Sequence, residues 1–108
     1  MSNLDLARRA VACKHWRWMP GMLAIVGVER QRVLSEKLPA YGDWLPDLTD
    51  AATLGCLLAL VREAWRDDSI CPDFNKMRWT ILTWDCCAIG DGGTEAEALV
   101  AALEAAPC

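Results

Sequence analysis

The segment LPDLTDAATLGCLLALVREAW (residues 45–65) predicts a buried helix and decides much of the fold. Pro46 disfavours helix at Leu45, so the helix should begin at Thr49 or Asp50. Apolar residues recur at helical spacing and define one packed face: Leu54, Leu57, Leu58, Val61 and Trp65. Cys56, Ala59 and Leu60 make the middle of the helix apolar almost all round, so most of it should be buried.

The segment TEAEALVAALEAAP (residues 94–107) predicts a second helix. Thr94 followed by Glu97 has the spacing of a capping box, which stabilises a helix N-terminus by about 1 kcal/mol. Leu99, Ala102, Leu103 and Ala106 then supply an apolar face. A shorter amphipathic helix, with N-cap choices at Ser2, Asn3 and Asp5, is predicted to run to about Cys13.

Strands are predicted between these helices. Residues 22–28 are typical of a buried strand, and residues 30–35 should pair with it after a turn near Glu29. Residues 69–74 and 76–84 predict a hairpin about Asn75; the apolar residues change face near Ile81, which indicates a bulge there or a sheet covered on both faces. Residues 37–44 and 90–93 are expected to be loops. The sequence therefore predicts an α+β fold: a small antiparallel sheet of three or four strands flanked by three helices, in one compact domain over residues 1–108.

Size and composition narrow the class of protein. A chain of 108 residues has room for one core, and 54% hydrophobic with 24% charged residues is typical of a globular protein. No apolar run reaches the roughly 20 residues of a membrane span. The N-terminal residues lack the apolar core of a signal peptide, so a cytoplasmic location is expected.

The six cysteines are expected to be reduced thiols, because no secretion signal is present and the two helices already supply a core; disulfides or a metal site are the alternatives. No CxxC pair is present. A zinc site from His15 with Cys13, Cys71, Cys86 or Cys87 is the metal alternative. Adjacent cysteines on a strand point to opposite faces and chelate poorly, so no metal site is predicted. The net charge of −4 disfavours direct binding of nucleic-acid phosphates.

No catalytic set emerges from the sequence. His15 is the single histidine, and on a helix Cys13 would lie on nearly the opposite face from it. Asp91 before residues 92–94 superficially resembles an anion-binding loop, but no Gly-rich phosphate motif accompanies it. We therefore expect no enzymatic activity, no catalytic residues and no cofactor.

Two short blocks carry a resemblance to a known family. RAVACK (residues 9–14) and WRWMPGM (residues 16–22) resemble the opening of a widespread group of small tailed-bacteriophage and prophage proteins of uncharacterised role. The helices at residues 45–65 and 94–107 look like that group's central and C-terminal helices, and the architecture is similar to the phage ABA-sandwich domain. The resemblance implies a phage origin and a fold with helices flanking a small sheet. It implies no catalytic residues.

Tryptophan is unusually abundant, with six Trp against one Tyr and one Phe. Trp and Arg are enriched at interface hot spots, and they can also stack on bases. The candidate partner-binding residues are Trp16, Arg17, Trp18, Arg30, Arg32 and Trp44. The alternative is that the tryptophans seal the ends of a small core, as expected for Trp65 and Trp79.

Two functions remain open from the sequence. The first is a non-catalytic phage accessory protein that binds and modulates a host protein or protein complex, such as a defence effector. The second is a binder of a small nucleotide signal, in which arginines and tryptophans would form the pocket. The sequence leaves open whether the protein forms a homodimer.

Overall fold

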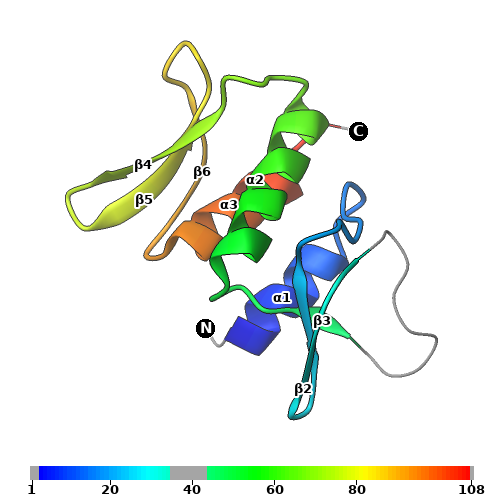
Figure 1. Cartoon of the computed structure of the whole chain (residues 1–108). Helices are drawn as coiled ribbons and strands as arrows, with labels where there is room; N and C mark the ends of the chain where they lie inside the picture. The colour runs from blue at the N-terminus through cyan, green and yellow to red at the C-terminus, as the bar shows by residue number, and fades with distance from the viewer. Residues whose placement is uncertain (1–2, 35–43, 108) are drawn as a thin grey trace.

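The computed structural model describes residues 3–34 and 44–107 (Figure 1). The elements follow in the order α1 (Asn3–Val11), β1 (Leu23–Val26), β2 (Glu29–Arg32), β3 (Leu45–Pro46), α2 (Ala51–Trp65), β4 (Cys71–Asn75), β5 (Arg78–Leu82), β6 (Ala88–Gly92) and α3 (Glu95–Glu104). The α+β class predicted from the sequence is confirmed. The strands divide between two antiparallel sheets of three strands each, sheet A (order β2-β1-β3) and sheet B (order β4-β5-β6).

Helix α2 has its N-cap at Asp50, one of the two predicted starting residues. The Asp50 side chain accepts a hydrogen bond from the Thr53 backbone N–H at 3.0 Å, which caps the N-terminus. At the other end Arg66 adopts a left-handed conformation, and its N–H donates to the carbonyls of Arg62 and Glu63. The buried positions are Thr53, Leu57, Leu60 and Val61, whereas Leu54 and Leu58 are half-buried. The packed face is therefore turned slightly from the one that the apolar spacing predicted.

Helix α3 starts at the predicted cap. The Thr94 hydroxyl accepts from the Glu97 N–H at 3.1 Å. The Glu97 carboxylate accepts at 3.3 Å from the N–H of Gly93, one residue before the position that a standard capping box uses. Leu99, Ala102 and Leu103 are fully buried, so this helix supplies much of the core. Helix α1 ends at Val11, two residues earlier than predicted.

Sheet B contains the predicted hairpin and the predicted irregularity. Asn75 pairs with Arg78, which leaves Lys76 and Met77 as a two-residue turn. The pairing of β5 with β6 shifts register between Ile81 and Leu82, so the bulge near Ile81 is confirmed. This shift lets Ile81 stay buried while the chain turns after Leu82.

Strand β6 corrects the expectation of a loop at residues 90–93. Gly90 and Gly92 lie in β6, where α3 packs directly on their backbone. A Cβ atom on Gly90 would lie 2.5 Å from the Ala98 carbonyl oxygen, and one on Gly92 would lie 2.5 Å from the Glu97 Cβ. From composition alone, these two glycines indicated a loop. In the structure they are required because α3 lies so close to β6 that no side chain fits between them.

Sheet A is formed by a hairpin and one short strand. Val26 pairs with Glu29, so the turn falls on Gly27 and Val28, slightly before the position predicted near Glu29. Strand β3, which the sequence analysis did not predict, pairs with β1 through Leu45 and Pro46. The predicted loop at residues 37–44 lies outside the described residues except for Trp44.

The helices lie between the two sheets (Figure 1). Helix α3 contacts β5 and β6 of sheet B, α1 contacts β3 of sheet A, and α2 packs on α3. One cluster of buried side chains runs from Leu6 to Leu103 and joins all three layers. The number of sheets did not follow from the sequence, because strand patterns do not identify the strands with which each one pairs.

Candidate functional site

Trp16 and Trp18, the centre of the predicted partner-binding set, lie between α1 and β1 and pack against each other. Their ring centroids are 5.4 Å apart at an interplanar angle of 81°, an edge-to-face arrangement. Both are half-buried against the core. The Nε1 atom of Trp16 is buried and has no hydrogen-bond partner among the described residues.

The predicted arginines pair with acids at the two ends of α2. Arg17 holds both oxygens of Glu63, at 2.6 and 2.7 Å, near the C-terminal end. At the N-terminal end Arg32 bonds Asp50 at 2.6 Å and Arg30 bonds Asp47 at 2.5 Å. Asp50 and Glu63 are 13 positions apart, or roughly 20 Å along the helix. The arginines therefore form two separate groups.

The two acids at the N-terminal end of α2, Asp47 and Asp50, have lowered pKa values. The bond from Arg32, helped by bonds from Thr53, lowers the pKa of Asp50 to about 2. For Asp47, burial acts to raise the pKa, but hydrogen bonds from Thr49 and Arg30 outweigh it and the pKa is lowered. Both carboxylates are tied to the start of α2, which gives them a structural role.

Trp44, the last member of the predicted set, is buried with 6% of its surface exposed. It joins the core instead of presenting its ring to a partner. The structure thus places the six predicted residues in three settings: a half-buried tryptophan pair, two groups of ion-paired arginines, and a core tryptophan.

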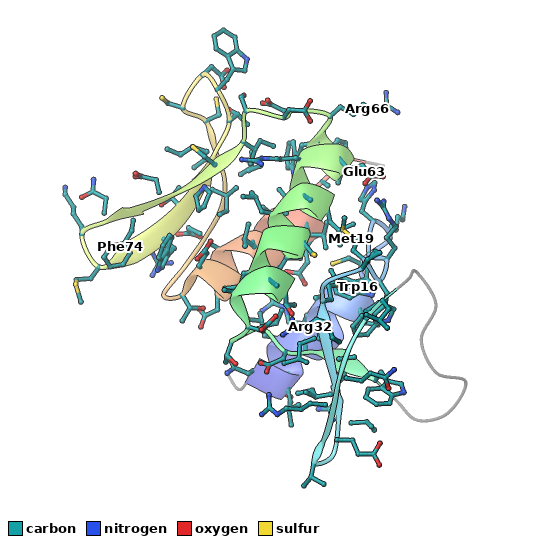
Figure 2. The ribbon with its side chains drawn as sticks, in the orientation of Figure 1. Trp16, Met19, Arg32, Glu63, Arg66 and Phe74 are labelled. Atoms are coloured by element: carbon teal, nitrogen blue, oxygen red, sulfur yellow. The ribbon has the colours of Figure 1, made fainter. Side chains whose placement is uncertain are left out.

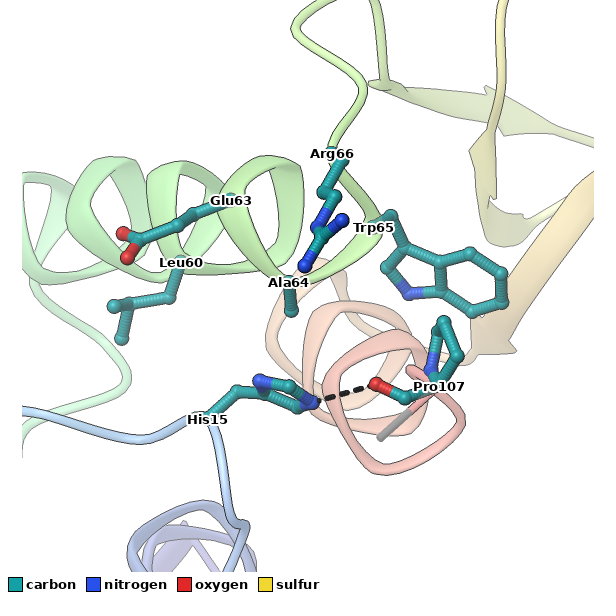
Figure 3. A pocket seen from close by; sticks show the side chains of 7 residues that line it. All are labelled: His15, Leu60, Glu63, Ala64, Trp65, Arg66 and Pro107. Carbon is teal, nitrogen blue, oxygen red and sulfur yellow. Dashed lines mark hydrogen bonds between the residues drawn. The ribbon is translucent and has the colours of Figure 1, made fainter.

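A pocket of about 480 Å³ opens where the C-terminal ends of α2 and α3 meet the segment after α1 (Figure 3). Its lining residues are His15, Leu60, Glu63, Ala64, Trp65, Arg66 and Pro107. His15 bonds the Pro107 carbonyl through Nε2 at 2.9 Å, and the Trp65 indole N–H donates to the Ala102 carbonyl at 2.8 Å. These bonds fix the walls of the pocket and join the chain after α1 to the end of α3.

The basic side chains at this pocket lie near helix C-termini, whose partial negative charge favours them. His15 bonds Pro107 just after α3, and Arg66 is the C-cap residue of α2. Arg66 extends toward Ala64 in Figure 3 and forms no ion pair within the described part of the chain. The pocket therefore offers one unpaired guanidinium and one indole ring.

No nucleophile with an adjacent base is found near this pocket among residues 3–34 and 44–107. Cys13 donates its thiol to the Arg9 carbonyl at 3.3 Å, and burial raises the pKa of that thiol. A raised pKa keeps the sulfur protonated and unreactive. Within the described ranges no group of three His, Cys, Asp or Glu side chains could hold a metal ion.

Other carboxylates of sheet B and its flanks belong to turns and surface pairs. Hydrogen bonds from Ser69 lower the pKa of Asp67, and a bond from Thr83 lowers the pKa of Asp85. Asp91, considered above for an anion-binding loop, bonds Arg78 at 2.9 Å. The contacts of Asp67 and Asp85 are of the kind that acidic residues make in ordinary turns, and the Asp91–Arg78 pair joins the surfaces of β6 and β5.

Three exposed apolar side chains of sheet B and its turns were missed by the sequence reasoning. Met77 is 82% exposed, Trp84 78% and Phe74 52%. Phe74, labelled in Figure 2, contacts Trp79 with ring centroids 5.1 Å apart. The sequence analysis placed Phe74 at the end of one predicted strand and Met77 and Trp84 near the two ends of the next, so no signal in it identified these side chains as exposed.

Comparison with protein-family models, characterised proteins and solved structures gave no match. None of the described helices is long and apolar enough to cross a lipid bilayer.

Proposed function

We propose that this protein is a non-catalytic binding protein that attaches to another macromolecule through sheet B. The observation that carries the proposal is the exposure of Phe74, Met77 and Trp84 on a chain of 108 residues. Large apolar side chains are also exposed at Leu4, Val28 and Leu34, but the exposed aromatic residues Phe74 and Trp84 belong to sheet B and the turn after β5, and Trp is enriched at interface hot spots. The arginines of sheet A, by contrast, already have carboxylate partners.

The resemblance to small phage proteins supports a particular setting for this activity. In that setting the protein acts in the cytoplasm of the host cell and its partner is a host protein or protein complex, such as a defence effector that it inhibits. The acidic net charge of −4 supports a protein partner over a nucleic acid.

Affinity capture from a bacterial host lysate tests the proposal. The wild-type protein should retain a defined host protein, and the double variant Phe74→Ser/Trp84→Ser should lose it. Val28→Ser is the matched control, because Val28 is fully exposed at the turn of sheet A. Equal retention by all three proteins, or no retention by the wild type, would contradict the proposal.

A second candidate function rests on the pocket at the helix ends. The indole of Trp65 and the guanidinium of Arg66, which forms no ion pair with any described acid, are the groups that would bind a small nucleotide by stacking and by charge. Native mass spectrometry of the freshly purified protein distinguishes the two. Added mass that corresponds to a nucleotide, and that is lost in Arg66→Ala, would favour this second function.

A further inference from the structure

Strand β2 is an open edge of sheet A. It pairs with β1 on one side only, and all four of its residues are exposed. Just after it, the Val33 N–H donates to the Met22 carbonyl and the Val33 carbonyl accepts from the Gly21 N–H, both at 2.8 Å, so Val33 turns its backbone groups toward β1. Because these groups alternate along an antiparallel strand, Arg30 and Arg32 turn theirs away from β1. These two residues therefore offer two N–H and two C=O groups without a backbone partner among the described residues.

The other sheet edges of the described chain are protected. Along β3 and β4 the same alternation turns Pro46 and Pro72 outward, and proline has no N–H to donate. At β6, α3 packs against the backbone and Gly92 is buried. Charge is another usual protection of an edge, but at β2 it is neutralised because both arginines have carboxylate partners. Among the described strands, β2 is thus the edge most open to pairing.

The alternation also limits how a second copy of the chain could pair with β2. Only residues that turn outward in both copies can exchange backbone bonds. One two-fold register places Arg30 opposite Arg32 of the second copy, twice, with Gln31 on the axis. The same register brings Val28 beside Leu34 of the second copy, and these are the two most exposed large apolar side chains described, at 100% and 86%. Each register shifted to either side places one of these apolar side chains opposite an arginine instead.

We propose that a second copy of this chain pairs with β2, antiparallel and about a two-fold axis at Gln31. Sheet A then continues through both copies in the order β3-β1-β2-β2-β1-β3. Four backbone hydrogen bonds between Arg30 and Arg32 of the two copies hold the pair, together with two contacts between Val28 and Leu34. An interface this small is weak, so half of the chains should be paired at about 10–100 µM. The pairing uses sheet A, so it does not depend on the function proposed for sheet B.

Sedimentation equilibrium over about 1–300 µM measures the pairing. Arg30→Pro removes an outward N–H but no bond to β1, so two of the four bonds are lost and the affinity should fall about tenfold or more. Arg30→Ala is the matched control, because it loses the same ion pair with Asp47 but keeps the N–H. Its affinity should stay within about threefold of the wild type.

A disulfide across the axis tests the register. The two copies of Gln31 form a non-hydrogen-bonded pair, with Cα atoms about 4.5 Å apart, which a disulfide can span. With glutathione disulfide as the oxidant, Gln31→Cys should give a linked dimer: the two thiols form one S–S bond, and the oxidant is reduced to two glutathione thiols. Glu29→Cys is the control, because Glu29 faces Val33 of the second copy and its own two copies lie far apart. The background for both variants has Ser at the exposed cysteines and at the C-terminal one: Cys71, Cys86, Cys87 and Cys108.

Three outcomes would overturn the proposal. The first is a wild type that stays monomeric over the whole concentration range. The second is equal pairing by Arg30→Pro and Arg30→Ala, which would place the contact elsewhere. The third is a linked dimer that forms as fast through Glu29→Cys as through Gln31→Cys, which would exclude this register. If Arg30→Pro does not fold, the difference in cross-linking between these two cysteine variants decides.

Discussion

At the scale of single residues, Gly90 and Gly92 determine how closely α3 can approach sheet B. An added Cβ at Gly90 would lie 2.5 Å from one backbone atom of α3 and 2.6 Å from another. Backbone atoms of a packed helix cannot move away as a flexible side chain can. The contact between α3 and β6 therefore depends on the absence of side chains at these two positions.

Gly90→Ala should destabilise the protein by about 1–3 kcal/mol because it forces α3 away from the sheet. Urea denaturation followed by tryptophan fluorescence measures the change. Gly55→Ala is the control, since nothing lies within 4 Å of a Cβ at that position of α2. The control should gain about 0.5–1 kcal/mol through better helix propensity. If Gly90→Ala leaves the free energy of unfolding unchanged, α3 does not lie as close to Gly90 as the structure shows.

Asp50 should make stability depend on pH. Its pKa is lowered to about 2 in the folded state, against 3.8 when unperturbed, mainly by Arg32. Its ionised form therefore adds stability that is fully present above about pH 5 and is lost as the pH falls toward 2. Partial exposure of the pair reduces this contribution to the order of 1 kcal/mol.

Thermal unfolding of the wild type and Asp50→Asn between pH 5 and pH 2 tests this expectation. The variant retains an N-cap acceptor, so it should lose less stability over this range than the wild type. Arg32→Gln should flatten the profile in the same way, because it removes the principal cause of the lowered pKa. If stability changes with pH in the same way in all three proteins, the Arg32–Asp50 pair does not contribute to the pH dependence.

At the scale of elements, Thr53 joins sheet A to α2. Its side chain is fully buried, accepts at 2.9 Å from the Leu23 N–H of β1 and donates at 2.9 Å to Asp50. Thr53→Val keeps the shape but leaves the Leu23 N–H unpaired, which should cost about 1–3 kcal/mol in the free energy of unfolding.

Hydrogen exchange at the Leu23 amide should identify the origin of that loss. The Thr53→Val variant should expose this amide to exchange earlier than the rest of the core. Thr80→Val in β5 is the control, because the β-branched replacement suits a strand and no side-chain hydrogen bond is recorded for Thr80 among the described residues. If the Leu23 amide stays as protected as before, the bond to Thr53 does not hold the strand.

At the scale of the whole molecule, burial divides the cysteines into two classes. Among the described residues, Cys71, Cys86 and Cys87 are exposed on sheet B and the turn after β5, whereas Cys13 just after α1 and Cys56 on α2 are half-buried. Burial raises the pKa of both half-buried thiols, which reduces their thiolate fraction. The rate at which each thiol reacts should therefore distinguish the exposed cysteines of sheet B and its turn from the half-buried cysteines near the helices.

Titration with a thiol reagent at pH 8 should show two phases in a Cys108→Ser variant. The three exposed cysteines should react rapidly, and Cys13 and Cys56 should react slowly until the protein is unfolded. The unfolded variant should then react at all five remaining cysteines with one rate. A single rapid phase in the native protein would contradict the burial of Cys13 and Cys56.

The sequence by itself determined the elements, because local signals specify them. The Asp50 and Thr94 caps, the turn after Asn75 and the bulge near Ile81 all depend on residues close together in the chain. Strand β6 was missed because its two glycines indicate a loop unless the helix packed against them is known. The presence of the other long strands and of all three helices followed from periodicity and propensity.

Only the tertiary structure decided which strands share a sheet and which surface residues are free. The candidate set from sequence chose Arg30, Arg32 and Trp44 by residue type, but the fold pairs the arginines with carboxylates and buries the tryptophan. It exposes Met77 and Trp84 instead, at turns of sheet B. Exposure and ion pairing depend on residues brought together from distant parts of the chain, so residue type and spacing alone do not specify them.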